Sequence, residues 1–331
     1  MARPLVDGFG RVHRDLRLSV TDRCSFRCTY CMPAEGMDWQ PRDELLTFEE
    51  IERLAGLLVE RFGIDSIRLT GGEPTVRAHL PVLVRKLAAL DVDLAMTTNG
   101  ATLPMVVDDL VAAGLGRINI SLDSLRPERF VAITRRDALP AVLEGIDAAV
   151  AAGLDPVKVN VVVMRGVNDD ELVDFADLGR ERGVVVRFIE FMPLDAQGEW
   201  QRHQVVTYDE ILDRIGAVHP LVPVAAPGER GSAPAERFAF ADGGGEIGII
   251  PSVSHAFCAT CDRIRLTADG QLRTCLFAHD DHDLRGPLRD GADDDELAAL
   301  VAAAVGTKEA GHQIGNVHFI RPSRSMSQIG G

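Results

Sequence analysis

The six cysteines of this chain fall into two sets of three, and none lies outside them. The first set, Cys24, Cys28 and Cys31, has the spacing C-x3-C-x2-C within one short segment. Thiolates at this spacing can ligate an iron–sulfur cluster or a metal ion. A structural zinc site normally has four protein ligands, so three cysteines leave one coordination position open to a small molecule. Unrelated buried cysteines, the alternative, fit poorly with the polar, arginine-bearing segments around both sets.

The second set consists of Cys258, Cys261 and Cys275, and His279 and His282 follow it closely. Spacing alone favours a zinc site made of three cysteines and one histidine. Sulfur ligands also suit iron–sulfur clusters, so the residue types leave both kinds of site open.

A scaffold of alternating strands and helices is predicted to position the first set. Apolar segments predict strands at 16–20, 66–69, 93–96, 117–120, 157–163 and 184–189. Amphipathic segments predict helices at 47–62, 80–90, 105–113, 139–152, 170–182 and 293–305. Thr47 and Glu50 have the spacing of a helix-capping box. About six βα units predict an α/β fold with a parallel sheet, too few for a closed eight-stranded barrel.

Polar residues follow the predicted strands at corresponding positions. They are Gly71-Gly72-Glu73-Pro74 after the second strand, Thr97 to Gly100 after the third, Ser121 and Asp123 at the fourth, Lys158 and Asn160 on the fifth, and Arg187 and Glu190 on the sixth. In barrel-like α/β folds the chemistry collects in the loops after the strands. These residues and the first cysteine set therefore predict one ring of site residues.

The alternation of strands and helices ends near residue 195. Segment 218–236 is rich in Pro, Gly, Ala and Ser and is interpreted as a linking loop. We expect three parts: a partial barrel over 1–195, a linker and second-cysteine region over 196–290, and a helix with a Gly-Gly tail over 291–331.

The first half of the chain resembles the radical S-adenosylmethionine (SAM) superfamily. An aromatic residue, Tyr30, stands directly before the last cysteine of C-x3-C-x2-C, and GGEP follows one strand and helix later. The resemblance implies an incomplete (β/α)6 barrel and a [4Fe-4S] cluster on Cys24, Cys28 and Cys31. It also implies that SAM chelates the fourth iron and that the GGEP segment holds its amino group.

The whole chain resembles the GTP 3′,8-cyclase family, which opens molybdenum-cofactor biosynthesis. The matching motifs are Leu-Arg17-Leu-Ser, 67–74, 157–160, 187–190, Phe-Cys-Ala-Thr-Cys-Asp-Arg-Ile-Arg at 257–265, Cys-Leu-Phe at 275–277 and Gln-Ile-Gly-Gly at 328–331. The resemblance implies that Cys258, Cys261 and Cys275 hold a second [4Fe-4S] cluster whose open iron binds the substrate purine. This region would then close the barrel. Segment 279–282 departs from the family pattern, which leaves the loop shape and any effect of its histidines on the cluster open.

The family resemblance also implies individual roles. SAM would contact Tyr30, Gly72, Ser121 and Met192. GTP would contact Arg17, Arg68, Thr97, Lys158, Arg263 and Arg265. The residues expected to be needed for catalysis are Arg17, Arg263, Arg265, Gly330 and Gly331. A 5′-deoxyadenosyl radical would abstract the ribose 3′ hydrogen, and GTP would become (8S)-3′,8-cyclo-7,8-dihydroguanosine 5′-triphosphate.

Composition limits the expected partners and location. The net charge of -15 argues against nucleic acid and anionic membranes. The longest apolar run, near 298–305, is far shorter than the ~20 residues of a membrane span. With no signal peptide visible at the N-terminus, a cytoplasmic location is predicted.

The expected partners are GTP, an external electron donor and the downstream cyclic pyranopterin monophosphate synthase; a homodimer is left open. Two alternatives remain, a radical SAM enzyme acting on a peptide and a non-catalytic iron–sulfur or zinc protein. Arg263, Arg265 and the Gly-Gly end favour GTP over a peptide. The GGEP segment and the polar ring would have no purpose in a non-catalytic protein.

Overall fold

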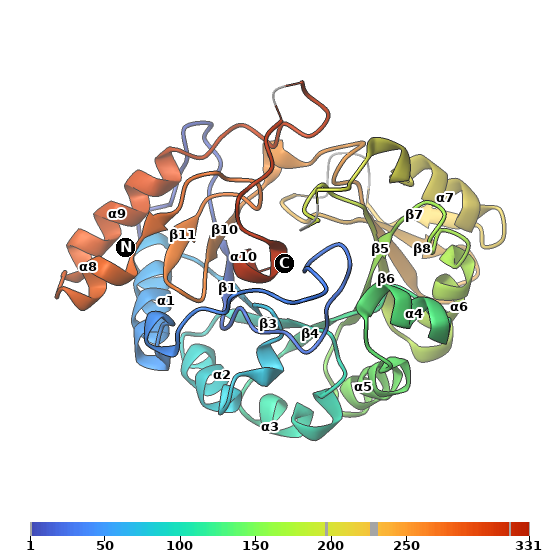
Figure 1. Ribbon diagram of the computed structural model, residues 1–331, viewed down its shortest axis with the longest axis horizontal. Helices are drawn as coiled ribbons and strands as arrows, with labels where there is room; N and C mark the ends of the chain where they lie inside the picture. Colours follow the sequence, from blue (N-terminus) through green and yellow to red (C-terminus); the bar gives the residue numbers. More distant parts are fainter. Residues whose placement is uncertain (1, 196–197, 226–230, 318, 331) are drawn as a thin grey trace.

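One open, curved sheet forms the wall of a partial barrel, and helices cover its outer side (Figure 1). The computed structural model describes residues 2–195, 198–225, 231–317 and 319–330. In these residues the strand order is β12-β11-β10-β1-β2-β3-β4-β5-β6-β9-β8-β7. β1 to β6 run parallel to one another. The α/β class and the incomplete barrel are therefore confirmed.

The strands are β1 Asp15–Ser19, β2 Ser66–Thr70, β3 Asp93–Thr98, β4 Arg117–Ser121, β5 Val157–Val163, β6 Val185–Glu190, β7 Leu221–Pro223, β8 Glu236–Phe240, β9 Glu246–Ile250, β10 Arg263–Leu266, β11 Gln271–Arg273 and β12 His282–Asp283. The α-helices are α1 Phe48–Phe62, α2 Leu80–Ala88, α3 Val107–Ala112, α4 Pro127–Thr134, α5 Leu139–Ala151, α6 Leu172–Arg182, α7 Tyr208–Gly216, α8 Arg285–Arg289, α9 Asp294–Gly306 and α10 Met326–Ile329.

The C-terminal region extends the sheet at both edges. β10 pairs in parallel with β1, and β9 pairs in parallel with β6. β11 and β12 continue one edge with antiparallel pairing, and β8 and β7 continue the other. Among the described strands the two outermost, β12 and β7, do not pair, so this region lengthens the wall and leaves the sheet open.

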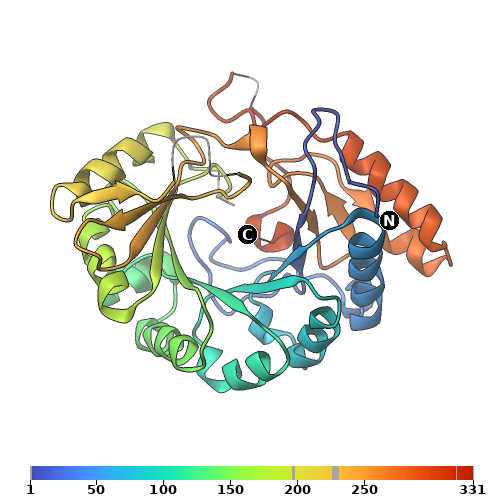
Figure 2. The ribbon, with the colours of Figure 1, turned by 180° about the vertical axis from the view of Figure 1, so that it is seen from behind.

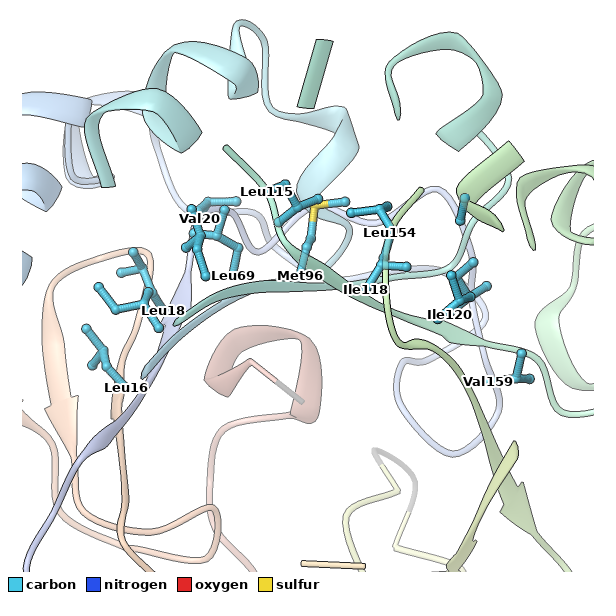
Figure 3. Close-up of a cluster of buried hydrophobic side chains, with 14 of the residues drawn as sticks. Leu16, Leu18, Val20, Leu69, Met96, Leu115, Ile118, Ile120, Leu154 and Val159 are labelled. Atoms are coloured by element: carbon cyan, nitrogen blue, oxygen red, sulfur yellow. The ribbon is translucent and has the colours of Figure 1, made fainter. Parts of the chain in front are cut away.

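The two faces of the sheet differ in polarity because successive side chains on a strand point to opposite sides. Leu16, Leu18, Leu69 and Ile118 are fully buried and belong to the main apolar core. Figure 3 shows such side chains along the helix-facing side of the sheet. The intervening residues, such as Arg17, must point into the barrel. α10 lies in that interior in both views (Figures 1 and 2).

The predicted elements of the first half lie within a few residues of the observed ones. β5 has the predicted bounds, and Thr47 caps α1 through reciprocal hydrogen bonds of 3.2 and 2.7 Å with Glu50. α4 and α7 were not predicted, and β7 lies within the segment interpreted as a linking loop. In the part of the chain that the structure describes, no helix combines the length and apolarity needed to cross a membrane.

Candidate functional site

The three thiols of the first cysteine set are half-buried in the loop that follows β1. Burial raises the pKa of Cys24 to about 11 and that of Cys31 to about 12, and it raises the pKa of Cys28 as well. The neighbouring thiols of the set add to this shift for Cys28 and Cys31, since a second thiolate nearby disfavours the charged form. Thiolates so disfavoured by their surroundings need a cationic centre, which a bound metal group supplies.

Arginines hold the backbone of this loop. The Arg27 guanidinium donates to the carbonyl oxygen of Cys24 at 2.6 Å. Arg135, at the end of α4, donates to the carbonyl oxygens of Arg27 and Met32 at 3.0 and 3.1 Å. Phe130 of α4 packs edge-on against Phe26 at 5.9 Å between ring centroids. The helix that the sequence did not predict is therefore a support of the first cysteine loop.

The GGEP segment is joined directly to the cysteine loop. The backbone N–H of Gly72 donates to Thr21 at 2.7 Å, and that of Glu73 donates to Arg23 at 2.7 Å. A Cβ atom on Gly72 would lie 2.2 Å from the carbonyl oxygen of Arg23, and one on Gly71 would lie 2.5 Å from that of Thr21. The glycines were expected to admit a ligand. In the structure the space beside them holds the chain's own backbone, which explains why no larger residue fits.

Glu73 fixes the neighbouring strand ends to one another. Its buried carboxylate accepts hydrogen bonds from the side chains of Thr75 and Thr98 at 2.7 and 2.6 Å, and from the backbone N–H of Asn99 at 2.6 Å. Burial raises the pKa of Glu73, and these hydrogen bonds oppose that rise. The Asn99 amide in turn donates to Ser25 Oγ at 3.0 Å. Glu73 therefore links GGEP, the β3 end and the cysteine loop.

The other expected SAM contacts lie at the same end of the barrel. Ser121 is the last residue of β4, and Met192 follows β6. The Tyr30 hydroxyl donates to Asp123 at 2.6 Å, and Asp123 also accepts from the backbone of Val162 at 2.8 Å. Burial raises the pKa of Asp123 to about 6. The structure thus brings Tyr30, Ser121 and Met192 to the strand ends, and it adds Asp123 as the group that orients Tyr30.

The inner face of the sheet carries a band of basic side chains. Arg265, Arg17 and Arg68 stand side by side on β10, β1 and β2. Further round the wall, Thr97 of β3, Asn119 of β4 and Lys158 of β5 form a second row. We define the basic band as Arg17, Arg68, Arg117, Lys158, Arg187, Arg263 and Arg265. It contains all the basic residues expected to bind GTP. Arg187 was expected in the ring of site residues but not as a GTP contact, and Arg117 was not expected at the site.

The basic band has few acidic partners among the described residues. Arg17 pairs with Asp15 through two contacts of 2.9 and 3.0 Å, and Arg117 pairs with Asp93. Burial and mutual repulsion lower the pKa of Lys158 to about 8 and that of Arg187 to about 9.

The remaining members of the band are Arg68, Arg263 and Arg265, and two of them have a donor nitrogen without a partner in the described residues. Burial, with repulsion from neighbouring arginines, lowers the pKa of Arg68 and lowers that of Arg265 to about 9. Arg68 Nε and Arg263 Nε are buried without a hydrogen-bond partner in the described residues. Buried donors of this kind normally have partners, and a polyanion would satisfy them and relieve the repulsion.

The C-terminal tail enters the interior beside this band. The backbone N–H of Ser327 in α10 donates to Cys31, and the hydroxyl of Ser325 contacts Met37 Sδ at 3.2 Å. Arg265 donates to the carbonyl oxygen of Gly330. A Cβ on Gly330 would lie 2.4 Å from Thr70 Oγ1, and its φ of 82° is in the left-handed region, so only glycine fits. Gly331 lies outside the described residues.

The second cysteine set lies beyond the basic band, around the start of β10. Burial raises the pKa of Cys258, and the other two thiols of the set raise it further. Burial also acts on Cys261, but Arg263 and Lys308 outweigh it and lower the pKa of that thiol. Gly311 is required here, because a Cβ would lie 2.9 Å from that of Cys258.

A cavity of about 260 Å³ adjoins Cys275, and both His279 and His282 line it. A ring nitrogen of His282 lies 3.4 Å from the Thr307 hydroxyl. The sequence left open whether these histidines affect the second cluster, and the structure places both beside Cys275.

Both cysteine sets have the ligand type of an iron–sulfur cluster. Within the described ranges, no three His, Cys, Asp or Glu side chains converge closely enough to hold a single ion. Tetrahedral zinc needs sulfurs about 2.3 Å from one centre, whereas a four-iron cluster is larger and spreads its thiolates. Each set supplies three free thiols, so a four-iron cluster bound there would have one iron without a cysteine ligand. The residues present therefore fit two [4Fe-4S] clusters, each with an open position.

Comparisons with known proteins agree with this arrangement. Residues 18–179 match the family model described as Radical SAM superfamily, and residues 184–314 match Molybdenum Cofactor Synthesis C. A solved structure of Streptococcus suis SuiB bound to S-adenosylmethionine has a TM-score of 0.62 at 11% identity, over 95% of this chain and 77% of that one. It shows a shared fold.

Three curated relatives named GTP 3′,8-cyclase cover nearly the whole chain. The Mycolicibacterium smegmatis protein is 51% identical over 99% of this chain and 92% of its own length. The Corynebacterium glutamicum (strain R) protein is 50% identical over 99% and 90%, and the Streptomyces coelicolor protein is 49% identical over 100% and 97%. At this identity and coverage, the chain belongs to the GTP 3′,8-cyclase family of radical SAM enzymes.

Proposed function

We propose that this chain converts GTP to (8S)-3′,8-cyclo-7,8-dihydroguanosine 5′-triphosphate, the first step of molybdenum-cofactor biosynthesis. One observation carries the proposal: the basic band lies between two three-cysteine sets, and the C-terminal tail contacts both the first set and the band. Ser327 donates to Cys31, and Gly330 accepts from Arg265, which interacts electrostatically with Cys261 and Cys275. A substrate with a triphosphate and a purine can occupy the region between the two cysteine sets, with its triphosphate against the basic band.

Cys24, Cys28 and Cys31 would hold the first cluster, and Tyr30, Gly72, Ser121 and Met192 would line the SAM site. When bound, cluster and SAM supply the 5′-deoxyadenosyl radical that takes the ribose 3′ hydrogen of GTP. Cys258, Cys261 and Cys275 would hold the second cluster, which leaves an iron open to the purine.

The basic band would bind and orient the triphosphate. Guanidinium groups fit phosphate oxygens through paired hydrogen bonds, and these arginines already have unsatisfied donors. Thr97, beside Asn119 on the inner face, would help to place the nucleotide. α10 and Gly330 lie in the barrel interior, and the family resemblance gives Gly330 and Gly331 a role in cyclisation.

The proposal extends to partners and organisation. We propose an external electron donor, delivery of the product to a cyclic pyranopterin monophosphate synthase, assembly as a homodimer and function in the cytoplasm. We also propose functional parts at 1–195, 196–290 and 291–331.

Anaerobic turnover tests the function directly. Reconstituted protein should hold about eight irons and should form the cyclic triphosphate from GTP in the presence of SAM and dithionite. Guanosine in place of GTP should give far less product, because it cannot engage the basic band. Formation of 5′-deoxyadenosine without any cyclic nucleotide, at saturating GTP, would contradict the proposal.

A further inference from the structure

A buried lysine outside the basic band lies against the second cysteine set. Lys308 follows α9 and is only 3% exposed. Its ammonium donates to the carbonyl oxygen of Arg263 at 2.7 Å and lies 3.5 Å from His13 Nδ1 and 3.9 Å from Cys261 Sγ. A buried ammonium is costly unless a negative charge compensates it, so the identity of that charge matters.

The carboxylate that contacts the other ring nitrogen of His13 is already engaged. Asp7 accepts from Arg11 Nε at 2.5 Å and lies 3.1 Å from His13 Nε2. Burial and Lys308 together lower the pKa of His13 to about 4, so the imidazole between Asp7 and Lys308 is neutral. Arg263 offers only its carbonyl oxygen. Among the described atoms that contact the Lys308 ammonium, Cys261 Sγ is the one that carries a full negative charge when it ligates a metal.

The Lys308 ammonium is held in a fixed position. The N-terminal hairpin, in which Val6 pairs with Val12, supplies His13 and Arg11 on one side. Arg11 also donates to the carbonyl oxygens of Cys258 and Ala310, both at 2.8 Å. The hairpin, the second cysteine loop and the segment after α9 therefore form one hydrogen-bonded unit.

We propose that Lys308 is a positioning residue for the second cluster: its charge stabilises the Cys261 thiolate and makes that cluster easier to reduce. The inference rests on the second cluster of the proposed function. Reduction potentials of iron–sulfur clusters depend on nearby charge and on hydrogen bonds to the sulfurs. A fixed cation beside one thiolate favours the more negative, reduced cluster.

The test is a redox titration of the anaerobic holoenzyme, followed by electron paramagnetic resonance. Lys308→Met removes the charge and keeps most of the stem, and Lys308→Arg keeps the charge. Lys86→Met, on α2 and paired with Glu52, is the matched control. The Cys258→Ala spectrum identifies the first-cluster signal, whose potential should be the same in every lysine variant.

We expect the second-cluster potential to become more negative in Lys308→Met and to return toward wild type in Lys308→Arg. Loss of the second cluster in Lys308→Met alone would also support a requirement for charge. An unchanged potential in Lys308→Met, or equal effects of Met and Arg, would overturn the inference and leave the proposed function intact. Wild-type protein with about four irons and one zinc would instead overturn the second cluster itself, and the inference with it.

Discussion

The buried Arg68 lowers the stability of the anion-free protein but is suited to bind a phosphate. Arg68 is 7% exposed, is repelled by Arg17 and Arg187, and has a buried Nε without a partner in the described residues. Such a group costs stability in the absence of an anion. Its retention at this position is understandable if a phosphate completes its hydrogen bonds.

Arg68→Met should therefore weaken GTP binding without reducing the stability of the GTP-free protein. Losing a charge-assisted contact of ~1.5–3 kcal/mol predicts a roughly 10- to 150-fold higher Kd for GTP. Equilibrium dialysis and anaerobic urea unfolding measure the two quantities. Arg61→Met, which removes an exposed partner of Asp295, is the control. Strong destabilisation with unchanged GTP binding would make Arg68 a structural residue.

His13 predicts a pH dependence of stability. Its folded-state pKa of about 4 lies below the ordinary value of 6.5, so the unfolded chain binds more protons between these values. Unfolding free energy should therefore rise with pH across this window, by up to about 3 kcal/mol from this residue. In His13→Gln that part of the slope should disappear, with His203→Gln as control. A slope retained in His13→Gln would assign it to other groups.

At the scale of elements, α10 and the glycine that follows it connect regions far apart in the chain. Gly330→Ala should displace the tail, because the new Cβ would meet Thr70 and the φ of 82° disfavours alanine. A left-handed alanine costs roughly 1–2 kcal/mol before any clash, so the ratio of cyclic product to 5′-deoxyadenosine should fall at least about 5- to 30-fold. Both clusters should remain.

Gly153→Ala is the matched control for backbone strain. Gly153 has nearly the same φ, 79°, but a Cβ there would meet nothing within 4 Å. If both alanine variants lower the product ratio equally, the tail is not specifically required.

Local patterns predicted most of the first-half elements but not those whose formation depends on distant contacts. The apolar alternation of 157–163 defines β5, because both of its faces have a clear polarity. α4 has eight residues, and its position is fixed by contacts with the cysteine loop about a hundred residues earlier. Such short helices depend on tertiary packing more than on propensity.

The candidate site shows the same division. Cysteine spacing and GGEP identify the first cluster region, since the motif lies in neighbouring loops. Arg117 and Arg187 join the basic band only through the lateral order of strands, and Arg265 stands beside Arg17 through a pairing between residues 248 positions apart. Periodicity along a single segment does not contain that information.

At the scale of the whole molecule, the second cysteine loop depends on the N-terminal hairpin. Arg11→Met should leave the carbonyl oxygens of Cys258, Glu309 and Ala310 without their donor. These partly buried hydrogen bonds join the hairpin to the second cysteine loop, so their loss should loosen that loop, and the second cluster should be lost as iron content falls from about eight to about four. Iron analysis measures this, and Arg14→Met, at an exposed pair with Asp65, is the control. Full iron content in Arg11→Met would show that the hairpin is dispensable.

The pairing of β10 with β1 and of β9 with β6 has a consequence for synthesis of the chain. Until the last third has left the ribosome, the six-stranded parallel sheet has two unpaired edges, β1 and β6. Open strand edges are templates for intermolecular pairing, and contacts of such large sequence separation form slowly. The nascent chain is therefore most exposed to aggregation during translation of residues 191–262, when a chaperone that shields strand edges would have its greatest effect on yield.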